Sequence, residues 1–65
     1  MQNPFATFMH ANYDNVSDNI NLIAEEHKLN VNVIPDGVDN IDIDDDRVNI
    51  WVNQHNGEIY KITFG

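Results

Sequence analysis

The spacing of apolar residues changes from a helical period to a strand period near residue 30. Before that point, inward-facing positions recur at helical spacing from Ser17 to Lys28. Ser17 is the expected N-cap, and Lys28 lies near the expected C-terminal end, where the helix dipole favours a cation. After that point, apolar and polar residues alternate as they do along a strand. The chain is therefore expected to place one main helix before a sheet.

The expected helix carries most of its apolar residues on one face, which also includes a histidine. These residues are Val16, Ile20, Ile23, Ala24 and His27. We expect His27 to be a partly buried packing residue rather than a ligand. Leu22 and Leu29 point away from this face, so they form a second apolar patch that needs a cover.

A shorter helix is expected over residues 4–11. Asn3 and Pro4 form a typical helix start, with asparagine as the N-cap and proline at the first helical position. Large apolar side chains then follow at helical spacing: Phe5, Phe8 and Met9. We expect them to cover the apolar surface around Leu22 or to meet in a dimer. Residues 12–15, with the sequence Asn-Tyr-Asp-Asn, are expected to form a turn.

Three strands are expected after the main helix, over residues 31–35, 47–53 and 58–64. The second strand has the most regular alternation. One of its faces carries Val48, Ile50 and Val52, and the other carries Arg47, Asn49 and Trp51. One face of the third strand carries Tyr60, Ile62 and Phe64.

The connections predict how these strands pair. Asn56-Gly57 is typical of a tight hairpin turn, which makes the last two strands antiparallel. The connection over residues 36–46 is too long for a simple hairpin, so the first two strands are expected to be parallel. The expected fold is α+β: one main helix packed on a small three-stranded mixed sheet, with a long acidic loop between the first two strands. A chain of 65 residues has room for one core, so we expect a single domain over residues 1–65.

The chain is strongly acidic, with eleven acidic residues, three basic residues and a formal charge of −8. This charge disfavours nucleic acids and anionic membranes as partners. It favours a basic protein surface, although the same charge would also simply keep a small protein soluble. Six of the carboxylates fall within the expected loop: Asp36, Asp39, Asp42, Asp44, Asp45 and Asp46.

The sequence contains no cysteine, so no disulfide and no thiolate chemistry is expected. This absence weakly favours a reducing compartment. The sequence shows no signal-peptide pattern, and no run approaches the roughly 18 apolar residues of a membrane span. We therefore expect a soluble protein, with the cytoplasm slightly favoured.

The residue types of common active sites do not occur in catalytic patterns. No motif places a base beside the hydroxyl residues Thr7, Ser17 or Thr63, and the three histidines lack the spacing of metal ligands. Asp42, Asp44 and Asp46 have the spacing of calcium ligands, but Arg47 stands where a calcium loop needs glycine. We therefore expect no enzyme activity, no cofactor and no metal site.

Two isoleucines interrupt the acidic loop. Ile41 and Ile43 alternate with Asn40, Asp42 and Asp44. Either both isoleucines pack into the core, or one is displayed for a partner. A displayed apolar residue on a loop anchored by strands at both ends is typical of a binding loop.

Several motifs together resemble the potato type I serine protease inhibitor superfamily, most closely its bacterial and fungal branch of small elastase inhibitors. These motifs are Pro35-Asp36-Gly37, the acidic loop, Asp46-Arg47-Val48-Asn49-Ile50, Asn56-Gly57 and Gly65. That branch typically has Pro-Gly at the loop entrance, Asp-Arg-Leu-Asn at the loop exit, an Asn-Gly hairpin and a final glycine. The resemblance covers roughly residues 31–65.

The resemblance implies that the loop binds a serine protease as a substrate would, with the scissile bond between Ile41 and Asp42. Ile41 would enter the primary specificity pocket. The partner-binding residues would be Asn40, Ile41, Asp42 and Ile43. Arg47 would project under the loop and pair with Asp42 or with loop carbonyls. Asn49 would brace the loop to a lesser degree, and Trp51 would pack below it.

The chain departs from the family pattern at a few positions: Asn40 replaces a threonine, and Phe64 stands where the branch often has cysteine. An alternative function is an acidic interaction protein that blocks a basic, nucleic-acid-binding surface of a partner protein. In both cases the expected partner is another protein, with neither nucleic acid nor membrane as a target. The expected state is a monomer or a weak homodimer.

Overall fold

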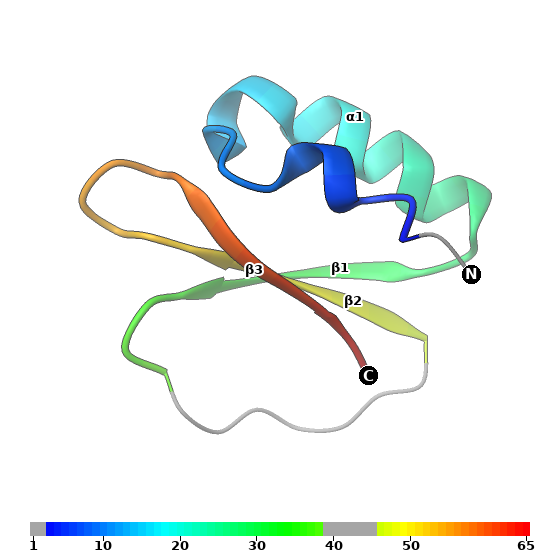
Figure 1. The fold of residues 1–65 in the computed structure, drawn as a ribbon. Helices are drawn as coiled ribbons and strands as arrows, with labels where there is room; N and C mark the ends of the chain where they lie inside the picture. Colours follow the sequence, from blue (N-terminus) through cyan, green and yellow to red (C-terminus); the bar gives the residue numbers. More distant parts are fainter. Residues whose placement is uncertain (1–2, 39–45) are drawn as a thin grey trace.

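The computed structural model describes residues 3–38 and 46–65. Within them the chain forms a short 3-10 helix η1 (Ala6–Phe8), the helix α1 (Tyr13–Glu26) and the strands β1 (Asn30–Pro35), β2 (Arg47–Val52) and β3 (Ile59–Phe64). Helix α1 covers one face of a three-stranded mixed sheet, and η1 lies on the same side (Figure 1). The predicted α+β fold is confirmed.

Helix α1 begins at Tyr13, one turn before the predicted start at Ser17. Asn12 is the N-cap, because its Oδ1 accepts a hydrogen bond from the backbone N–H of Asp14 at 2.9 Å. The predicted turn over residues 12–15 is therefore wrong. Asparagine is as good a cap as serine, and Asp14 lies in the first turn, where the helix dipole favours a carboxylate.

Helix α1 ends at Glu26, and Lys28, two residues later, lies in the left-handed region at φ 57°. The backbone N–H of Lys28 donates to the carbonyl of Glu25, and that of Leu29 donates to the carbonyl of Ala24. This pair of bonds is the Schellman motif, in which glycine usually takes the left-handed position. His27 is the C-cap and is exposed, so the prediction that it packs on the inner face is wrong.

The N-terminal segment forms the short helix η1 rather than a helix over residues 4–11. Asn3 supports its start as expected, because Asn3 Oδ1 accepts from the backbone N–H of Phe5 at 2.8 Å. Phe5 and Phe8 lie in the main core, whereas Leu22 is 60% exposed. The prediction that these aromatic residues cover Leu22 is therefore wrong. They instead fill the space between α1 and the sheet.

The core lies between the helices and the inner face of the sheet. Its buried members are Phe5, Phe8, Ile20, Ala24, Val48, Ile50 and Ile59. Val48 and Ile50 are fully buried here, which confirms the predicted face of β2. Among the described residues, no helix is long and apolar enough to cross a membrane.

Strand β2 is the central strand. It pairs in parallel with β1, from Asn30 opposite Arg47 to Pro35 opposite Val52, as predicted. It pairs antiparallel with β3, with Val48 opposite Phe64 and Ile50 opposite Ile62. Side chains of paired residues therefore share a face across all three strands.

A bulge interrupts the pairing of β2 with β3. Trp51 lies opposite Lys61, but Val52 lies opposite Ile59, so Tyr60 is the additional residue. Because a bulge inserts one unpaired position, Ile59 turns into the core and Tyr60 is 39% exposed. That Tyr60 shares the face of Ile62 stays a prediction, because the bulge interrupts the alternation at this point.

The connection between β2 and β3 is longer than a two-residue turn. The backbone N–H of Asn53 donates to the carbonyl of Glu58 at 2.8 Å, and that of Gly57 donates to the carbonyl of Asn53 at 2.7 Å. Residues 54–57 thus form the loop of the predicted hairpin. Gly57 has φ 74°, and a Cβ on it would lie 3.1 Å from Asn12 Nδ2, so glycine suits this position on both counts.

The segment that precedes α1 adds backbone pairing that the sequence analysis did not anticipate. The backbone N–H of His10 donates to the carbonyl of Ile59 at 2.7 Å, and that of Ile59 donates to the carbonyl of Ala11 at 2.9 Å. Asn12 forms an isolated antiparallel bridge with Glu58. The segment is thus fixed to the beginning of β3.

Candidate binding surface

The face of the sheet that α1 does not cover carries the three residues predicted to brace a binding loop. We call it the outer sheet face; its residues are Asn32, Ile34, Arg47, Asn49, Trp51, Lys61 and Thr63. The structure brings Arg47, Asn49 and Trp51 together on β2, as the strand period predicts. Because β2 is central, side chains from both neighbouring strands flank these three residues.

Asn49 is the most buried polar residue of the outer sheet face, with 1% of its surface exposed. Its Nδ2 donates to the carbonyl oxygen of Gly65 at 2.8 Å and to Thr63 Oγ1 at 3.2 Å. Its Oδ1 accepts from Asn32 Nδ2 at 3.2 Å. This chain of bonds crosses all three strands and satisfies a buried amide that would otherwise destabilise the fold.

Both amide hydrogens of Asn49 are engaged by β3 and the residue that follows it. The hydrogen bonds of Asn49 to described residues therefore link the strands of the sheet. Its bracing of the loop stays a prediction. The sequence places Asn49 on this face of the central strand, but its burial and its partners depend on the register of both neighbouring strands.

Trp51 is fixed by contacts at the other end of the outer sheet face. It is 8% exposed, and its Nε1 lies 3.3 Å from Thr63 Oγ1. The ammonium nitrogen of Lys61 lies 5.1 Å from the centroid of the Trp51 ring, which is within the range of a cation–π interaction. The ring is thus held from β3 as well as from its own strand.

Arg47 is half-buried at the beginning of β2. Its Nε and Nη2 atoms are buried, and neither has a hydrogen-bond partner among residues 3–38 and 46–65. A buried guanidinium N–H without an acceptor destabilises a fold, so both groups favour an acceptor such as a carboxylate or a carbonyl. Arg47 therefore has donor capacity that the described residues do not use.

Both ends of the connection between β1 and β2 are tied to the sheet. At the entrance, the backbone N–H of Asp36 donates to the carbonyl of Val52 at 3.0 Å. At the exit, the carbonyl of Asp46 accepts from the backbone N–H of Asn30 at 2.7 Å. The connecting segment therefore starts and ends at fixed points.

Asp36 also contacts the β2–β3 hairpin. Its Oδ1 accepts from the backbone N–H of Gln54, and Gln54 Nε2 donates to its carbonyl, both at 2.9 Å. The backbone N–H of Gln54 lowers the pKa of the Asp36 carboxyl, because the hydrogen bond favours the ionised form. This contact was not predicted from the sequence. Aspartate after proline indicated a turn, but nothing in the sequence indicated which residue it would contact.

The predicted partner-binding residues Asn40, Ile41, Asp42 and Ile43 lie outside the described residues. The same holds for Asp44, one of the carboxylates considered for calcium. Within the described ranges, no group of three or more histidine or acidic side chains could hold a metal ion.

A search of known protein families gives no matching family model, and no curated protein is significantly similar to the chain.

Proposed function

We propose that this protein is a serine protease inhibitor-like domain that presents an extended binding loop around Ile41 and Asp42. The observation that supports it best is the parallel pair of β1 and β2, whose connection is tied to the sheet at both ends, with Arg47 beside its exit. The proposed activity is binding, without catalysis and without a cofactor.

Fixed ends matter because an inhibitor must bind like a substrate and yet lose little conformational entropy. Asp36 and Asp46 set the two ends. The Nε and Nη2 groups of Arg47 have no acceptor among the described residues, and in this proposal they bind the segment between those ends. In this proposal Ile41 enters the primary specificity pocket of the protease. Asn40, Asp42 and Ile43 contact the protease on either side of that pocket.

The experiment is incubation with a panel of serine proteases that accept aliphatic side chains. We expect inhibition and an intact complex by size-exclusion chromatography and mass spectrometry. Ile41→Ala should weaken inhibition, whereas Leu22→Ala, on the exposed side of α1, should not. Rapid cleavage after Ile41 without inhibition would contradict the proposal, and so would inhibition that Ile41→Ala leaves unchanged.

A second candidate is an acidic protein that blocks a basic, nucleic-acid-binding surface. It is favoured by four exposed carboxylates on α1, in addition to the acidic residues in the sequence between β1 and β2. The four on α1 are Asp14, Asp18, Glu25 and Glu26. Competition with nucleic acid for a basic domain would test it. This candidate would be favoured over the first by two results together. The protein displaces nucleic acid from the basic domain in a salt-dependent way that the double variant Glu25→Gln/Glu26→Gln loses, and it inhibits none of the proteases in the panel.

A further inference from the structure

We infer that Asn56 is a deamidation site that the folded hairpin holds closed. Asparagine loses its amide most readily before glycine, because glycine leaves its own backbone nitrogen unhindered. Asn56-Gly57 is the one Asn-Gly pair in the sequence, and every other asparagine precedes a larger residue. This inference is independent of the proposed function.

The reaction needs only the chain and water. The backbone nitrogen of Gly57 attacks Cγ of Asn56, and a new C–N bond closes a five-membered imide. The side-chain nitrogen leaves as ammonia and carries away the proton that Gly57 loses. Water then opens the imide at one of its two carbonyls. The product is aspartate, or isoaspartate with the backbone running through the former side chain.

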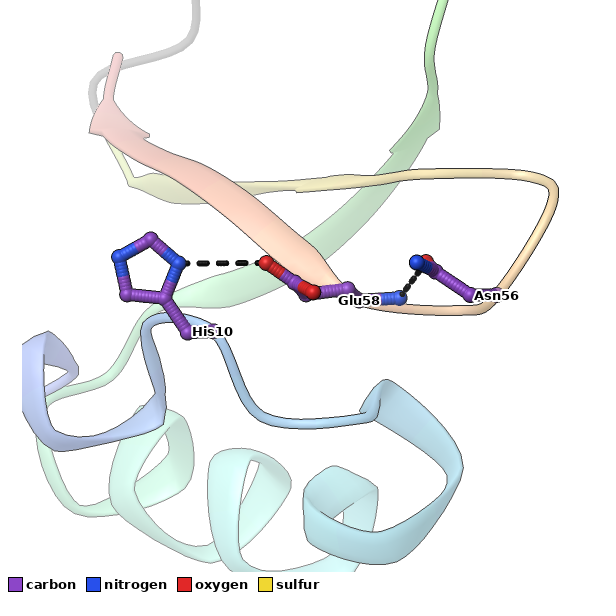
Figure 2. A network of polar contacts seen from close by, with 3 residues as sticks. All are labelled: His10, Asn56 and Glu58. Atoms are coloured by element: carbon purple, nitrogen blue, oxygen red, sulfur yellow. Dashed lines mark hydrogen bonds and ion pairs between the residues drawn. The ribbon is translucent and has the colours of Figure 1, made fainter.

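The folded hairpin engages both reacting groups. The Gly57 N–H donates to the carbonyl of Asn53 at 2.7 Å, so the nucleophile is occupied. Asn56 Oδ1 accepts from the backbone N–H of Glu58 at 2.9 Å, which turns the side-chain amide toward Glu58 (Figure 2). The bond between Asn56 Oδ1 and the Glu58 N–H, and the bond between the Gly57 N–H and the Asn53 carbonyl, must both break before the ring can close.

The segment before α1 holds the same hairpin from outside. Asn12 Nδ2 donates to the carbonyl of Asn56 at 2.9 Å, and the backbone N–H of Tyr13 donates to the carbonyl of Gly57 at 2.8 Å. His10 Nδ1 lies 3.2 Å from Glu58 Oε2 (Figure 2). These contacts stabilise the closed hairpin, so they are expected to slow a reaction that requires the bonds of Gly57 N–H and Asn56 Oδ1 to open.

The modification would act on the same contact. Isoaspartate adds a methylene to the backbone between Asn56 and Gly57 and displaces the carbonyls that Asn12 and Tyr13 bind. Asparagine 56 is exposed, so water reaches the imide as soon as it forms. Conversion to isoaspartate is therefore expected to weaken the bonds of Asn12 and Tyr13 to the hairpin, while the backbone pairing of His10 and Ala11 with Ile59 remains.

The test compares the full chain at mildly alkaline pH in buffer and in denaturant, with conversion located by peptide mapping and an isoaspartate assay. We expect Asn56 to convert first in denaturant, and at least about ten-fold more slowly in the folded chain, since the reactive form requires local opening. Equal rates in the two conditions, or earlier conversion of another asparagine in denaturant, would overturn the inference.

A variant tests the contribution of the N-terminal segment. Asn12→Asp keeps the oxygen that caps α1 but removes the donor to the Asn56 carbonyl. We expect it to raise the folded-state conversion of Asn56 several-fold at unchanged helix content by circular dichroism. Asn15→Asp, an exposed change of equal charge in the same helix, should leave the rate unaltered. If the conversion rate of Asn56 in folded Asn12→Asp is unchanged, the N-terminal segment does not protect Asn56.

Discussion

Asn49 and its partners show how one buried side chain can hold three strands together. Its amide contacts Asn32 on β1 and both Thr63 and Gly65 at the end of β3. An apolar residue would pack equally well at a buried position of β2 but would leave these partners without bonds. The residue is therefore better explained by polar pairing than by burial alone.

Asn49→Ala is expected to lower the free energy of unfolding by about 2–3 kcal/mol, because it leaves buried polar groups unpaired. Chemical denaturation measures this change. Asn32→Ala, which removes a single bond from a partly buried residue, is the matched control and should cost about 1 kcal/mol. A loss for Asn49→Ala no larger than that of the control would show that the chain of bonds is unimportant.

Arg47→Ala is expected to leave the core intact, because Arg47 is not part of the core cluster, and to cost about 1 kcal/mol of stability or less, as for an ion pair near the surface. Its effect should appear in the connection between β1 and β2, which becomes sensitive to proteolysis near Ile41. Arg47→Lys should restore resistance only in part, because lysine lacks the planar donor fork. Unfolding of the whole domain, or an unchanged resistance in Arg47→Ala, would contradict the bracing role.

Asp36 links stability to acid pH. Its pKa is lower in the folded chain than its ordinary value, so its ionised form stabilises the fold above that ordinary value. The contribution is lost as the pH falls below about 4 toward the lowered pKa. Asp36→Asn keeps the acceptor oxygen without the charge. The stability difference between wild type and Asp36→Asn should therefore shrink between neutral pH and pH about 3 in denaturation experiments. A difference that does not change with pH would contradict this role.

At the scale of elements, the ends of α1 show where local sequence is informative. The Asn12 cap follows local rules, but Ser17 satisfied the same rules. A helix that begins at Tyr13 also gains the hydrogen bond from Tyr13 N–H to the carbonyl of Gly57, a tertiary contact that local rules do not include. At the other end, the left-handed turn falls on Lys28, where side chains other than glycine are strained.

Lys28→Gly is expected to raise the free energy of unfolding by about 1 kcal/mol, since glycine adopts the left-handed conformation without strain. Lys28→Ala removes the same charge but keeps the strain, so it should give no gain. Thermal and chemical denaturation of the pair separate the two effects. Equal stability of the two variants would show that the backbone at this position is not strained.

The strand pattern predicted the class of fold, the order of the strands and the faces of β2, because alternation is a local property. The bulge at Tyr60 and the loop of residues 54–57 were not predictable, since both depend on how two strands meet. The same holds for the outer sheet face. Arg47, Asn49 and Trp51 were placed together by period, whereas Thr63 and Gly65 joined them through the register of β3.

At the scale of the whole molecule, the N-terminal residues are part of the core. Phe5 is fully buried, and its ring centroid lies 6.0 Å from that of Phe64. A domain of this size has a free energy of unfolding of roughly 3–10 kcal/mol. The contribution of one large core side chain is therefore a substantial share of that free energy.

Phe5→Ala is expected to cost about 3–5 kcal/mol, enough to unfold a large fraction of the chain at elevated temperature. Leu22→Ala, which removes a side chain that is 60% exposed, should change stability by no more than about 0.5 kcal/mol. Thermal melts of the two variants give the comparison. Similar melting temperatures would show that the N-terminal segment is not part of the cooperative unit.

The pairing of the segment before α1 with the start of β3 also bears on how the chain folds. His10 and Glu58 are 48 positions apart, so this contact closes most of the chain into a loop. Closing a longer loop costs entropy before any contact compensates for it, and each doubling adds about 0.6 kcal/mol. Folding rates fall as contacting residues become more distant in sequence. The segment before α1 should therefore pair with the start of β3 late in folding, after β2 has paired with β3. The chain should also fold more slowly than a helical bundle of equal length.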